Sequence, residues 1–195
     1  RGTGSPACCI PNLPDSVLGM RGYFGIGVEG ISKPMNAGNL FRTAHAFGAS
    51  FIFTVNSEIA LSDIARSDTS ESWKQTPFYR YGSVPDMDLP KDCSLVGLEF
   101  IEDATELPSF RHPPRAAYVL GRELGSLTPE IQERCAFIVQ IPTRFCVNVG
   151  TAGAIVMYDR MLSMGRFAER PVGAGAPVPA TAVPNPGRVP RRAIG

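Results

Sequence analysis

Two short clusters in this sequence combine residue types that suit a bound anion or small ligand. The first, Asn36–Ala44, joins amide side chains at a predicted helix start to the guanidinium of Arg42, an arrangement that suits a phosphate. Taken singly, Asn36 also fits a helix cap and Arg42 a surface ion pair. The second, Gly121–Gly125, follows a predicted strand and brackets Glu123, so that a ligand can touch the backbone. Its spacing is neither G-x-G-x-x-G nor that of a phosphate-binding loop.

A third cluster, Cys146 with Asn148, lies where a predicted strand passes into a predicted helix. A cysteine becomes a nucleophile when a base such as histidine activates it. Neither His45 nor His112 is near Cys146 in the sequence. We therefore expect Cys146 to be a plain, half-buried thiol.

The stretch Cys135–Met161 has to position this third cluster. Its apolar run Ala136–Ile141 predicts a buried strand, and Pro142 ends it because proline has no N–H for a β-ladder. An almost wholly apolar helix follows, so we expect it to be buried or to lie against a partner. Asn148 or Thr151 is the predicted cap. Glycines in its first turns cost about 1 kcal/mol each relative to alanine, which indicates that another group approaches the backbone closely.

Strands and helices alternate through most of the chain. Apolar runs predict strands at Tyr23–Val28, Ser50–Val55, Leu95–Phe100 and Ala116–Leu120. Helical spacing predicts a helix over Asn36–Phe47, and Thr128 caps a short helix that Pro129 begins. A strand, a helix and a strand in this order form a β-α-β unit. The sequence thus predicts an α/β fold, a mostly parallel sheet flanked by helices.

The segment Trp73–Ser83 mixes aromatic residues with Lys74 and Arg80. Such a mixture can stack on RNA bases and neutralise phosphates. A loop packed by its own aromatic side chains is the alternative interpretation.

Composition divides the chain into three parts. Residues 1–19 are predicted to be a flexible extension, 20–168 a folded domain, and 169–195 a disordered tail rich in Pro, Gly, Ala and Arg. The formal net charge is only +1, so nucleic-acid binding requires a local basic patch. Five cysteines without metal-ligand spacing and only two histidines indicate a reduced, cytoplasmic protein without a metal, and no apolar run predicts a membrane span.

Taken together, the three clusters match an ordered set of motifs. N-x-G-x-x-x-R-x-A-x-x-F-G spans Asn36–Gly48, and V-L-G-x-E-x-x-S-L spans Val119–Leu127. I-P, followed by N-V-x-x-A-x-A-I-V-x-Y, spans Ile141–Tyr158. In order and spacing these resemble the motifs of SpoU-type RNA 2′-O-ribose methyltransferases, the TrmH family within the SPOUT class.

The resemblance implies a sheet closed by a deep C-terminal trefoil knot, a homodimer, and S-adenosyl-L-methionine as cofactor. It implies that a structured RNA, a tRNA or an rRNA, is methylated on a ribose 2′-hydroxyl. Matching positions imply catalytic roles for Asn36, Arg42, Glu123 and Asn148, with Arg42 also binding RNA. They place the cofactor on Leu98, Glu99, Leu120, Gly121, Glu123, Gly125, Ile141, Pro142, Cys146, Val147, Asn148 and Ala152.

In this interpretation Arg42 holds the target phosphate and the ribose oxygen, and the hydroxyl proton passes to phosphate or water; a neutral Arg42 acting as the base is the alternative. The chain departs from the family where Cys146 replaces a common serine and where the loop between Ile141 and Asn148 is shorter. Two other functions stay open: an RNA-binding protein that does not methylate, and a methyltransferase acting on a base nitrogen.

Overall fold

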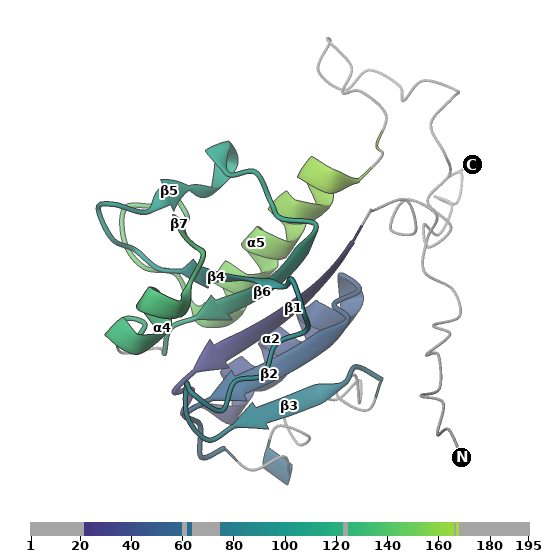
Figure 1. Ribbon diagram of the computed structural model, residues 1–195, viewed down its shortest axis with the longest axis vertical. Helices are drawn as coiled ribbons and strands as arrows, with labels where there is room; N and C mark the ends of the chain where they lie inside the picture. Colours follow the sequence, from purple (N-terminus) through teal and green to yellow (C-terminus); the bar gives the residue numbers. More distant parts are fainter. Residues whose placement is uncertain (1–21, 60–61, 64–74, 123–124, 166, 168–195) are drawn as a thin grey trace, which may run out of the picture.

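The computed structural model describes residues 22–59, 62–63, 75–122, 125–165 and 167. In this part of the chain, seven parallel strands form one sheet in the order β3-β2-β1-β6-β4-β7-β5 (Figure 1). The strands are β1 (Tyr23–Glu29), β2 (Phe51–Val55), β3 (Phe78–Tyr81), β4 (Ser94–Leu98), β5 (Thr105–Glu106), β6 (Arg115–Leu120) and β7 (Phe137–Gln140). The predicted α/β class and mostly parallel sheet are confirmed.

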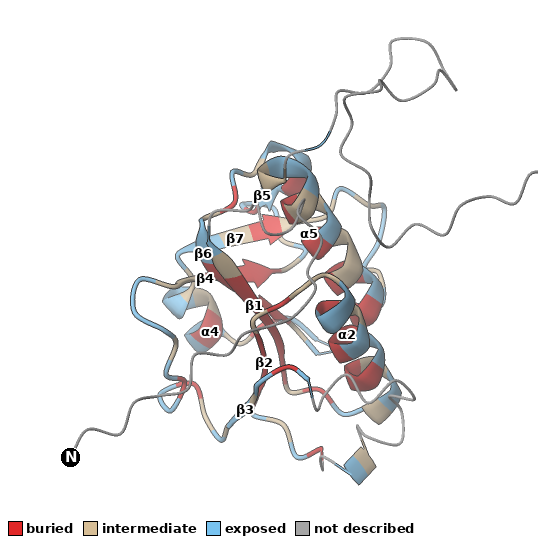
Figure 2. Ribbon diagram, turned by 90° about the vertical axis from the view of Figure 1, so that its right-hand side faces the viewer, coloured by how far each residue is buried: buried red, intermediate tan, exposed pale blue. Residues whose placement is uncertain are grey.

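Helices cover both faces of this sheet. Helices α2 (Pro34–Ala46) and α5 (Val149–Met164) lie side by side on one face (Figure 2). The short helix α4 (Pro129–Arg134) packs on the other face, and a 3-10 turn, η2 (Leu107–Ser109), follows β5. Within the described residues, no helix is long and apolar enough to cross a membrane.

Strands β3 and β5 were not predicted from the sequence. The four residues of β3 are aromatic or charged, and two of them are exposed, so no apolar run marks the strand. Strand β5 has only two residues, both exposed. Pairing to a neighbouring strand at the edge of the sheet, rather than burial, makes each of them a strand.

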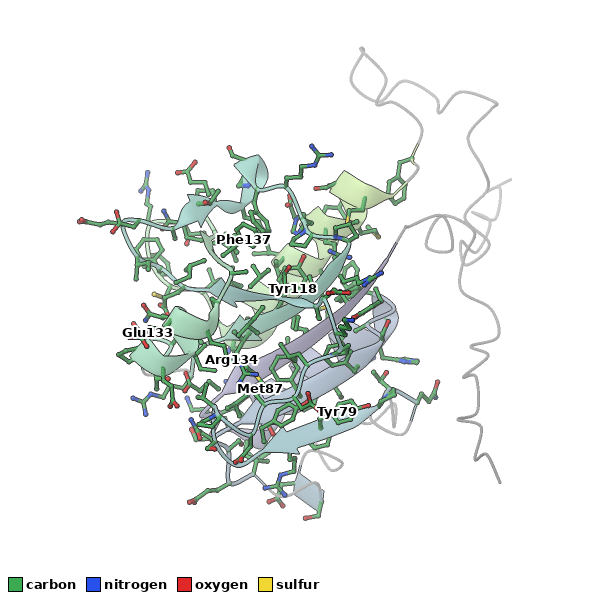
Figure 3. All side chains as sticks on the ribbon, in the orientation of Figure 1. Tyr79, Met87, Tyr118, Glu133, Arg134 and Phe137 are labelled. Atoms are coloured by element: carbon green, nitrogen blue, oxygen red, sulfur yellow. The ribbon has the colours of Figure 1, made fainter. Side chains whose placement is uncertain are left out.

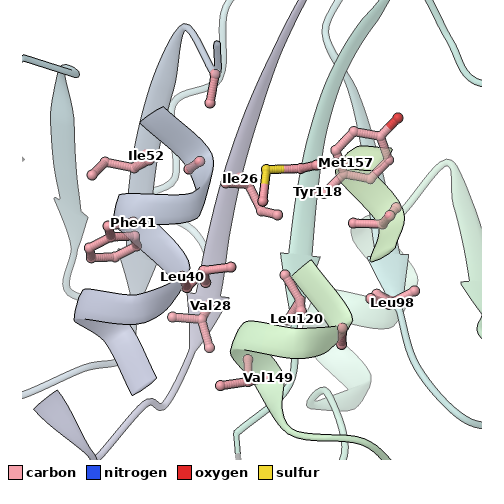
Figure 4. Close-up of a cluster of buried hydrophobic side chains, with 14 of the residues drawn as sticks. Ile26, Val28, Leu40, Phe41, Ile52, Leu98, Tyr118, Leu120, Val149 and Met157 are labelled. Carbon is pink, nitrogen blue, oxygen red and sulfur yellow. The ribbon is translucent and has the colours of Figure 1, made fainter. Parts of the chain in front are cut away.

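Successive side chains along the central strands enter two separate cores. On the face under α2 and α5, Ile26 of β1 and Tyr118 of β6 join the larger core (Figure 4). On the opposite face, Ala117 and Val119 of β6 join the core under α4, which contains Ile131. Because both faces are covered, these strands are apolar throughout, as is typical of parallel sheets.

Two glycines of β1 make room for the aromatic rings of β2. A Cβ atom at Gly25 would lie 2.2 Å from the ring of Phe51, and one at Gly27 would lie 2.5 Å from the ring of Phe53. Each ring therefore lies flat over the neighbouring strand, on the face that carries α4. The same two rings contact the tyrosines of β3 at the edge of the sheet.

The close approach predicted for the first turns of α5 comes from α2. A Cβ atom at Gly153 would lie 2.2 Å from Cδ1 of Leu40, and one at Gly150 would lie 2.7 Å from Nδ2 of Asn39. The two glycines thus let side chains of α2 pack directly against the backbone of α5.

The far end of α5 is fixed by a buried arginine. The sequence marked Arg160 only as a terminal charge, but its side chain is 1% exposed. Its guanidinium donates to the carbonyl oxygens of Tyr23, Pro113 and Pro114, which lie where β1 and β6 begin. It also donates to Oη of Tyr118. These acceptors offset the cost of burying a cation.

A buried histidine extends this network. His112 lies between Oη of Tyr118, 2.6 Å from Nδ1, and Oδ2 of Asp159, 2.9 Å from Nε2. Asp159 accepts the Nε2 proton, which leaves Nδ1 to accept from Tyr118. Burial lowers the pKa of His112, although Asp159 acts in the opposite direction. Protonation would also place a second cation beside the phenol oxygen that Arg160 already contacts.

We predict that Gly153→Val lowers the free energy of unfolding by about 1–3 kcal/mol, because its side chain must displace Leu40. Urea denaturation measures this change. Thr151→Val, an exposed position of the same helix, is the matched control and should change stability far less. Equal stability of the two variants would contradict the packing described above.

We also predict a pH-dependent loss of stability from His112. Its folded pKa lies below the ordinary value of about 6.5, so the unfolded chain binds the extra proton as the pH falls below 6.5. The free energy of unfolding should then fall by up to about 1.4 kcal/mol per pH unit from this group. Urea titrations between pH 8 and pH 5 should show a weaker dependence for His112→Gln. Identical slopes for the two proteins would exclude His112 as the source.

Candidate functional site

A pocket of about 500 Å³ lies beyond the carboxyl ends of β4, β6 and β7, where α2 and α5 begin. Open parallel sheets bind ligands at this edge, and the volume is that of a small-molecule site. The segments that line it are far apart in the sequence. They supply Lys33, Asn36, Leu98, Glu99, Phe100, Leu120, Gly121, Arg122, Gly125, Ser126, Ile141, Thr143, Cys146, Val147, Asn148, Val149 and Ala152.

Two asparagines join the helices at the pocket wall. Nδ2 of Asn148 donates to Oδ1 of Asn36 over 3.2 Å. Oδ1 of Asn148 accepts from the N–H of Gly150 over 2.9 Å, so the same side chain caps α5, as predicted. Asn148 therefore fixes the start of α5 and its distance from the first turn of α2.

Glu99 shapes the floor of the pocket. Its carboxylate accepts from the N–H of Leu127 over 2.6 Å and from the N–H of Phe100 over 3.0 Å. This ties the end of β4 to the loop that follows β6. A Cβ atom at Gly121 would lie 3.2 Å from Oε2 of Glu99, so a glycine keeps that loop close to the carboxylate.

A second carboxylate, Glu29, was missed by the sequence analysis. It is 4% exposed and accepts from both the N–H and the hydroxyl of Thr128, over 2.8 and 2.7 Å, and from Nδ2 of Asn56. Thr128 in turn caps α4. Glu29 thus anchors the end of the pocket loop to β1. Its signal in the sequence is an acidic residue that ends an otherwise apolar strand.

Two basic side chains lie at the mouth of the pocket. Lys33 and Arg122 are exposed and line it, and the sequence analysis named neither of them. Helices α2 and α5 both begin at the pocket, and neither has an acidic residue in its first turn. Helix N-termini carry partial positive charge, so both helices add to the potential of the two side chains.

The predicted site residues fall into three groups. The residues predicted for the cofactor line the pocket, except Pro142, which does not, and Glu123, which lies outside the described residues together with Lys74. The predicted catalytic pair Asn36 and Asn148 is in direct contact. Arg42 is exposed in the third turn of α2 and does not line the pocket.

The predicted aromatic and basic segment lies partly on β3. Tyr79 and Tyr81 stack on one another with ring centroids 6.4 Å apart, and Tyr79 is exposed at the edge of the sheet (Figure 3). Phe78 points to the other face and packs against Phe41. Arg80 donates to the carbonyl oxygen of Ser57. Phe78 and Tyr81 therefore serve packing, Tyr79 is 49% exposed, and Trp73 lies outside the described residues.

The expectation of a half-buried thiol at Cys146 is wrong, because this cysteine is exposed. It lies in the short loop after β7, where the chain crosses the open mouth of the pocket rather than the core. Neither ring nitrogen of His45 or His112 reaches it: His45 contacts Thr76, and His112 lies in the buried network with Arg160.

Comparison with known proteins adds independent information. The family model described as the SpoU rRNA Methylase family matches residues 24–158. A 23S rRNA (guanosine-2′-O-)-methyltransferase of Coxiella burnetii is 28% identical over 139 residues, covering 68% of this chain and 55% of that protein. A tRNA (guanosine(18)-2′-O)-methyltransferase of Mus musculus is 25% identical over 138 residues, 66% of this chain and 9% of that protein. The chain thus spans about half the length of the first relative and a small part of the second.

Solved structures resemble this chain in fold. The SpoU methyltransferase AviRb of Streptomyces viridochromogenes, in complex with the cofactor AdoMet, superposes with a TM-score of 0.65 at 20% identity, covering 76% of this chain and 63% of that one. A TrmH/SpoU tRNA modifying enzyme of A. aeolicus gives a TM-score of 0.60 at 18% identity, covering 76% and 79%.

Two substitutions of Asn148 distinguish how much the α5 cap and the contact with Asn36 each contribute to stability. Asn148→Ala removes both and should lower the free energy of unfolding by about 0.5–2 kcal/mol. Asn148→Asp keeps an acceptor for Gly150 and adds a negative charge at a helix start, so it should stay close to the wild type. Urea denaturation compares the three proteins. Equal loss in both variants would show that the asparagine contact, and not the cap, determines stability here.

Proposed function

The chain belongs to the SpoU rRNA Methylase family, and we propose from this premise that it transfers a methyl group from S-adenosyl-L-methionine to a ribose 2′-hydroxyl of RNA. The family match confirms the resemblance deduced from the three motifs. One observation carries the proposal: the three motif segments, widely separated in the chain, meet at a single pocket. The curated relatives, which methylate a guanosine 2′-oxygen of rRNA or tRNA by their names, support the same reaction.

The pocket fits the proposed cofactor in size and chemistry. Its volume of about 500 Å³ lies within the range of small-molecule sites, and it combines apolar side chains with backbone loops. Leu98, Ile141 and Val147 would hold the adenine, and the backbone around Gly121 would hold its ribose. When bound, the cofactor supplies a methyl group already activated by its sulfonium. The protein has only to position the acceptor and to accommodate the proton that it loses.

Positioning is the main task of the side chains at the helix starts. The ribose oxygen must lie in line with the methyl group, and such alignment can account for about 7–11 kcal/mol of a barrier. Asn36 and Asn148, joined across the pocket wall, present fixed amide groups to the nucleotide. We assign the hydroxyl proton to phosphate or water, because a charged guanidinium is a poor base. Glu123, which lies outside the described residues, is proposed to keep its predicted catalytic role.

Arg42 is proposed to hold the RNA beside the reacting nucleotide. It is exposed, and within the described residues its guanidinium makes no hydrogen bond or ion pair. It lies six residues after Asn36, about 9 Å along the helix axis, and side chains on a helix lean toward the N-terminus. An RNA strand that leaves the pocket along α2 therefore meets Arg42 next. Lys74 and Arg80 are proposed to extend the RNA path.

A knot and a homodimer belong to the same proposal. Strand β7 lies on the outer side of β4 in the sheet, whereas the next element, α5, packs on α2. The segment between β7 and α5 must therefore cross back over the ends of β4 and β6. This crossing supports the threading typical of the family. On the outer side of α5, Tyr158 and Leu162 are exposed, and Phe145 is 74% exposed nearby in the sequence. Such apolar exposure supports burial against a second copy. We place the protein in the cytoplasm, as its free thiols suggested.

The reaction is tested with RNA from cells in which the gene has been deleted, because this RNA carries the unmodified target whatever its identity. Purified protein and cofactor labelled in the methyl group should transfer label to RNA, and mapping should place it on ribose 2′-oxygens. Label on a base nitrogen, or no label at all, would reject the proposal.

We predict that Arg42→Ala raises the KM for RNA by about three- to tenfold, because it removes one exposed charge-assisted contact to the RNA. Cofactor affinity, measured by calorimetry, should stay within a few-fold of wild type because Arg42 does not line the pocket. Arg111→Ala, an exposed arginine where the chain approaches β6, is the control and should keep full activity. An unchanged KM for RNA in Arg42→Ala would remove this residue from the mechanism.

A further inference from the structure

We infer that Lys33 and Arg122 form a phosphate clamp, a pair of positioning residues that holds an RNA backbone phosphate at the mouth of the pocket. The inference rests on the proposed function and specifies which side chains present the target nucleotide to the cofactor. Both residues line the pocket and both are exposed. They come from separate loops at the same edge of the sheet, Lys33 after β1 and Arg122 after the neighbouring β6.

Backbone contacts place the Arg122 side chain at the pocket mouth. A Cβ atom at Gly125 would lie 2.7 Å from Nε of Arg122, and one at Gly30 would lie 3.5 Å from its Cδ. The arginine therefore runs between two glycines from separate loops. Gly30 also has a positive φ of 60°, which favours glycine at that position. Any larger residue at Gly125 would push the guanidinium from this path.

Lys33 lies at the N-cap of α2. Its carbonyl oxygen accepts from the N–H groups of Asn36 and Ala37, so its backbone is fixed while its side chain makes no cap bond. Among the described residues, neither Lys33 nor Arg122 has an ion-pair partner. Two cations without counter-ions and two helix N-termini thus converge on one pocket.

Among the described residues, the two carboxylates nearest to the site form no ion pair with Lys33 or Arg122. Glu99 directs its oxygens at the N–H groups of Leu127 and Phe100, and Glu29 is buried against Thr128. Both carboxylates hold loops rather than cations. Lys33 and Arg122 therefore remain available to an incoming anion, although the whole chain has a formal net charge of only +1.

The ligand that suits this charge is the RNA. The proposed cofactor carries a sulfonium and an ammonium against one carboxylate, so as a whole it gains little from two more cations. A nucleic-acid phosphate is a full anion next to the reacting ribose, and arginine and lysine are its usual partners. A clamp on this phosphate holds the RNA equally before and during methyl transfer, so its loss is expected in KM rather than in kcat.

The test compares Lys33→Gln, Arg122→Gln and the double variant with two matched controls, Lys91→Gln and Arg111→Gln. The controls remove exposed cations at the opposite end of the sheet, before β4 and β6. Methyl transfer is measured with RNA from gene-deleted cells, at several salt concentrations, and cofactor affinity is measured by calorimetry.

Each clamp substitution should raise the KM for RNA by about three- to tenfold, as for one partly exposed charge-assisted contact. The value of kcat and the cofactor affinity should stay within about twofold. The dependence of log affinity on log salt should become shallower by about 0.7–0.9 per cation removed. Neither control variant should change any of these quantities.

If the Lys33 and Arg122 variants keep the wild-type KM and salt dependence, the clamp is overturned. The proposed function would still stand in that case, provided that the wild-type protein methylates RNA. A weaker cofactor affinity with unchanged KM for RNA would also overturn the clamp, because the two cations would then hold the cofactor carboxylate. Wild-type protein that methylates no RNA would reject the proposed function itself, and the clamp with it.

Discussion

The close contact between α2 and α5 is the constraint on which the rest of this structure depends. Gly150 and Gly153 cost helix stability, yet any larger residue would have to displace the side chains of Asn39 and Leu40 that pack against them. Because the two helices pack so closely on one face of the sheet, their N-termini reach the same edge, beyond the strands that end there. The hydrogen bond between Asn36 and Asn148 then joins the two helix starts. The close packing of α2 on α5 thus brings the first and third motifs together.

The two ends of α5 are fixed by different interactions, a side-chain cap at the pocket and a buried arginine at the opposite end. At the pocket, Asn148 caps the helix with a neutral side chain and leaves space for a ligand. At the opposite end, Arg160 is buried among backbone carbonyl groups and lies over the ring of Phe24, with its centroid 5.4 Å away. A buried cation whose two terminal guanidinium nitrogens both donate to protein oxygens is a strong anchor, because any displacement leaves these donors unpaired. The stable end of the helix therefore lies away from the chemistry.

Two carboxylates at the strand ends show how charge is distributed around the pocket. Glu29 and Glu99 accept bonds from backbone N–H groups of the segment that follows β6, so they hold the pocket loop in place. Acidic side chains used in this way leave the basic groups at the mouth without counter-ions. A protein of almost neutral net charge can thereby present a local positive potential to a polyanion.

The sequence alone determined the fold class, the positions of the long apolar strands and helices, the cap Thr128 and the family, because each depends on local patterns or motif order. For the cap of α5 it left Asn148 and Thr151 as alternatives, and the structure shows Asn148. The sequence did not predict β3 and β5, which are strands only through pairing with a neighbour. It also missed Glu29, Lys33 and Arg122, whose roles depend on contacts or on a shared pocket between segments remote in the chain. Tertiary structure decided that Arg160 is buried and Cys146 exposed, because burial is set by what packs above a residue.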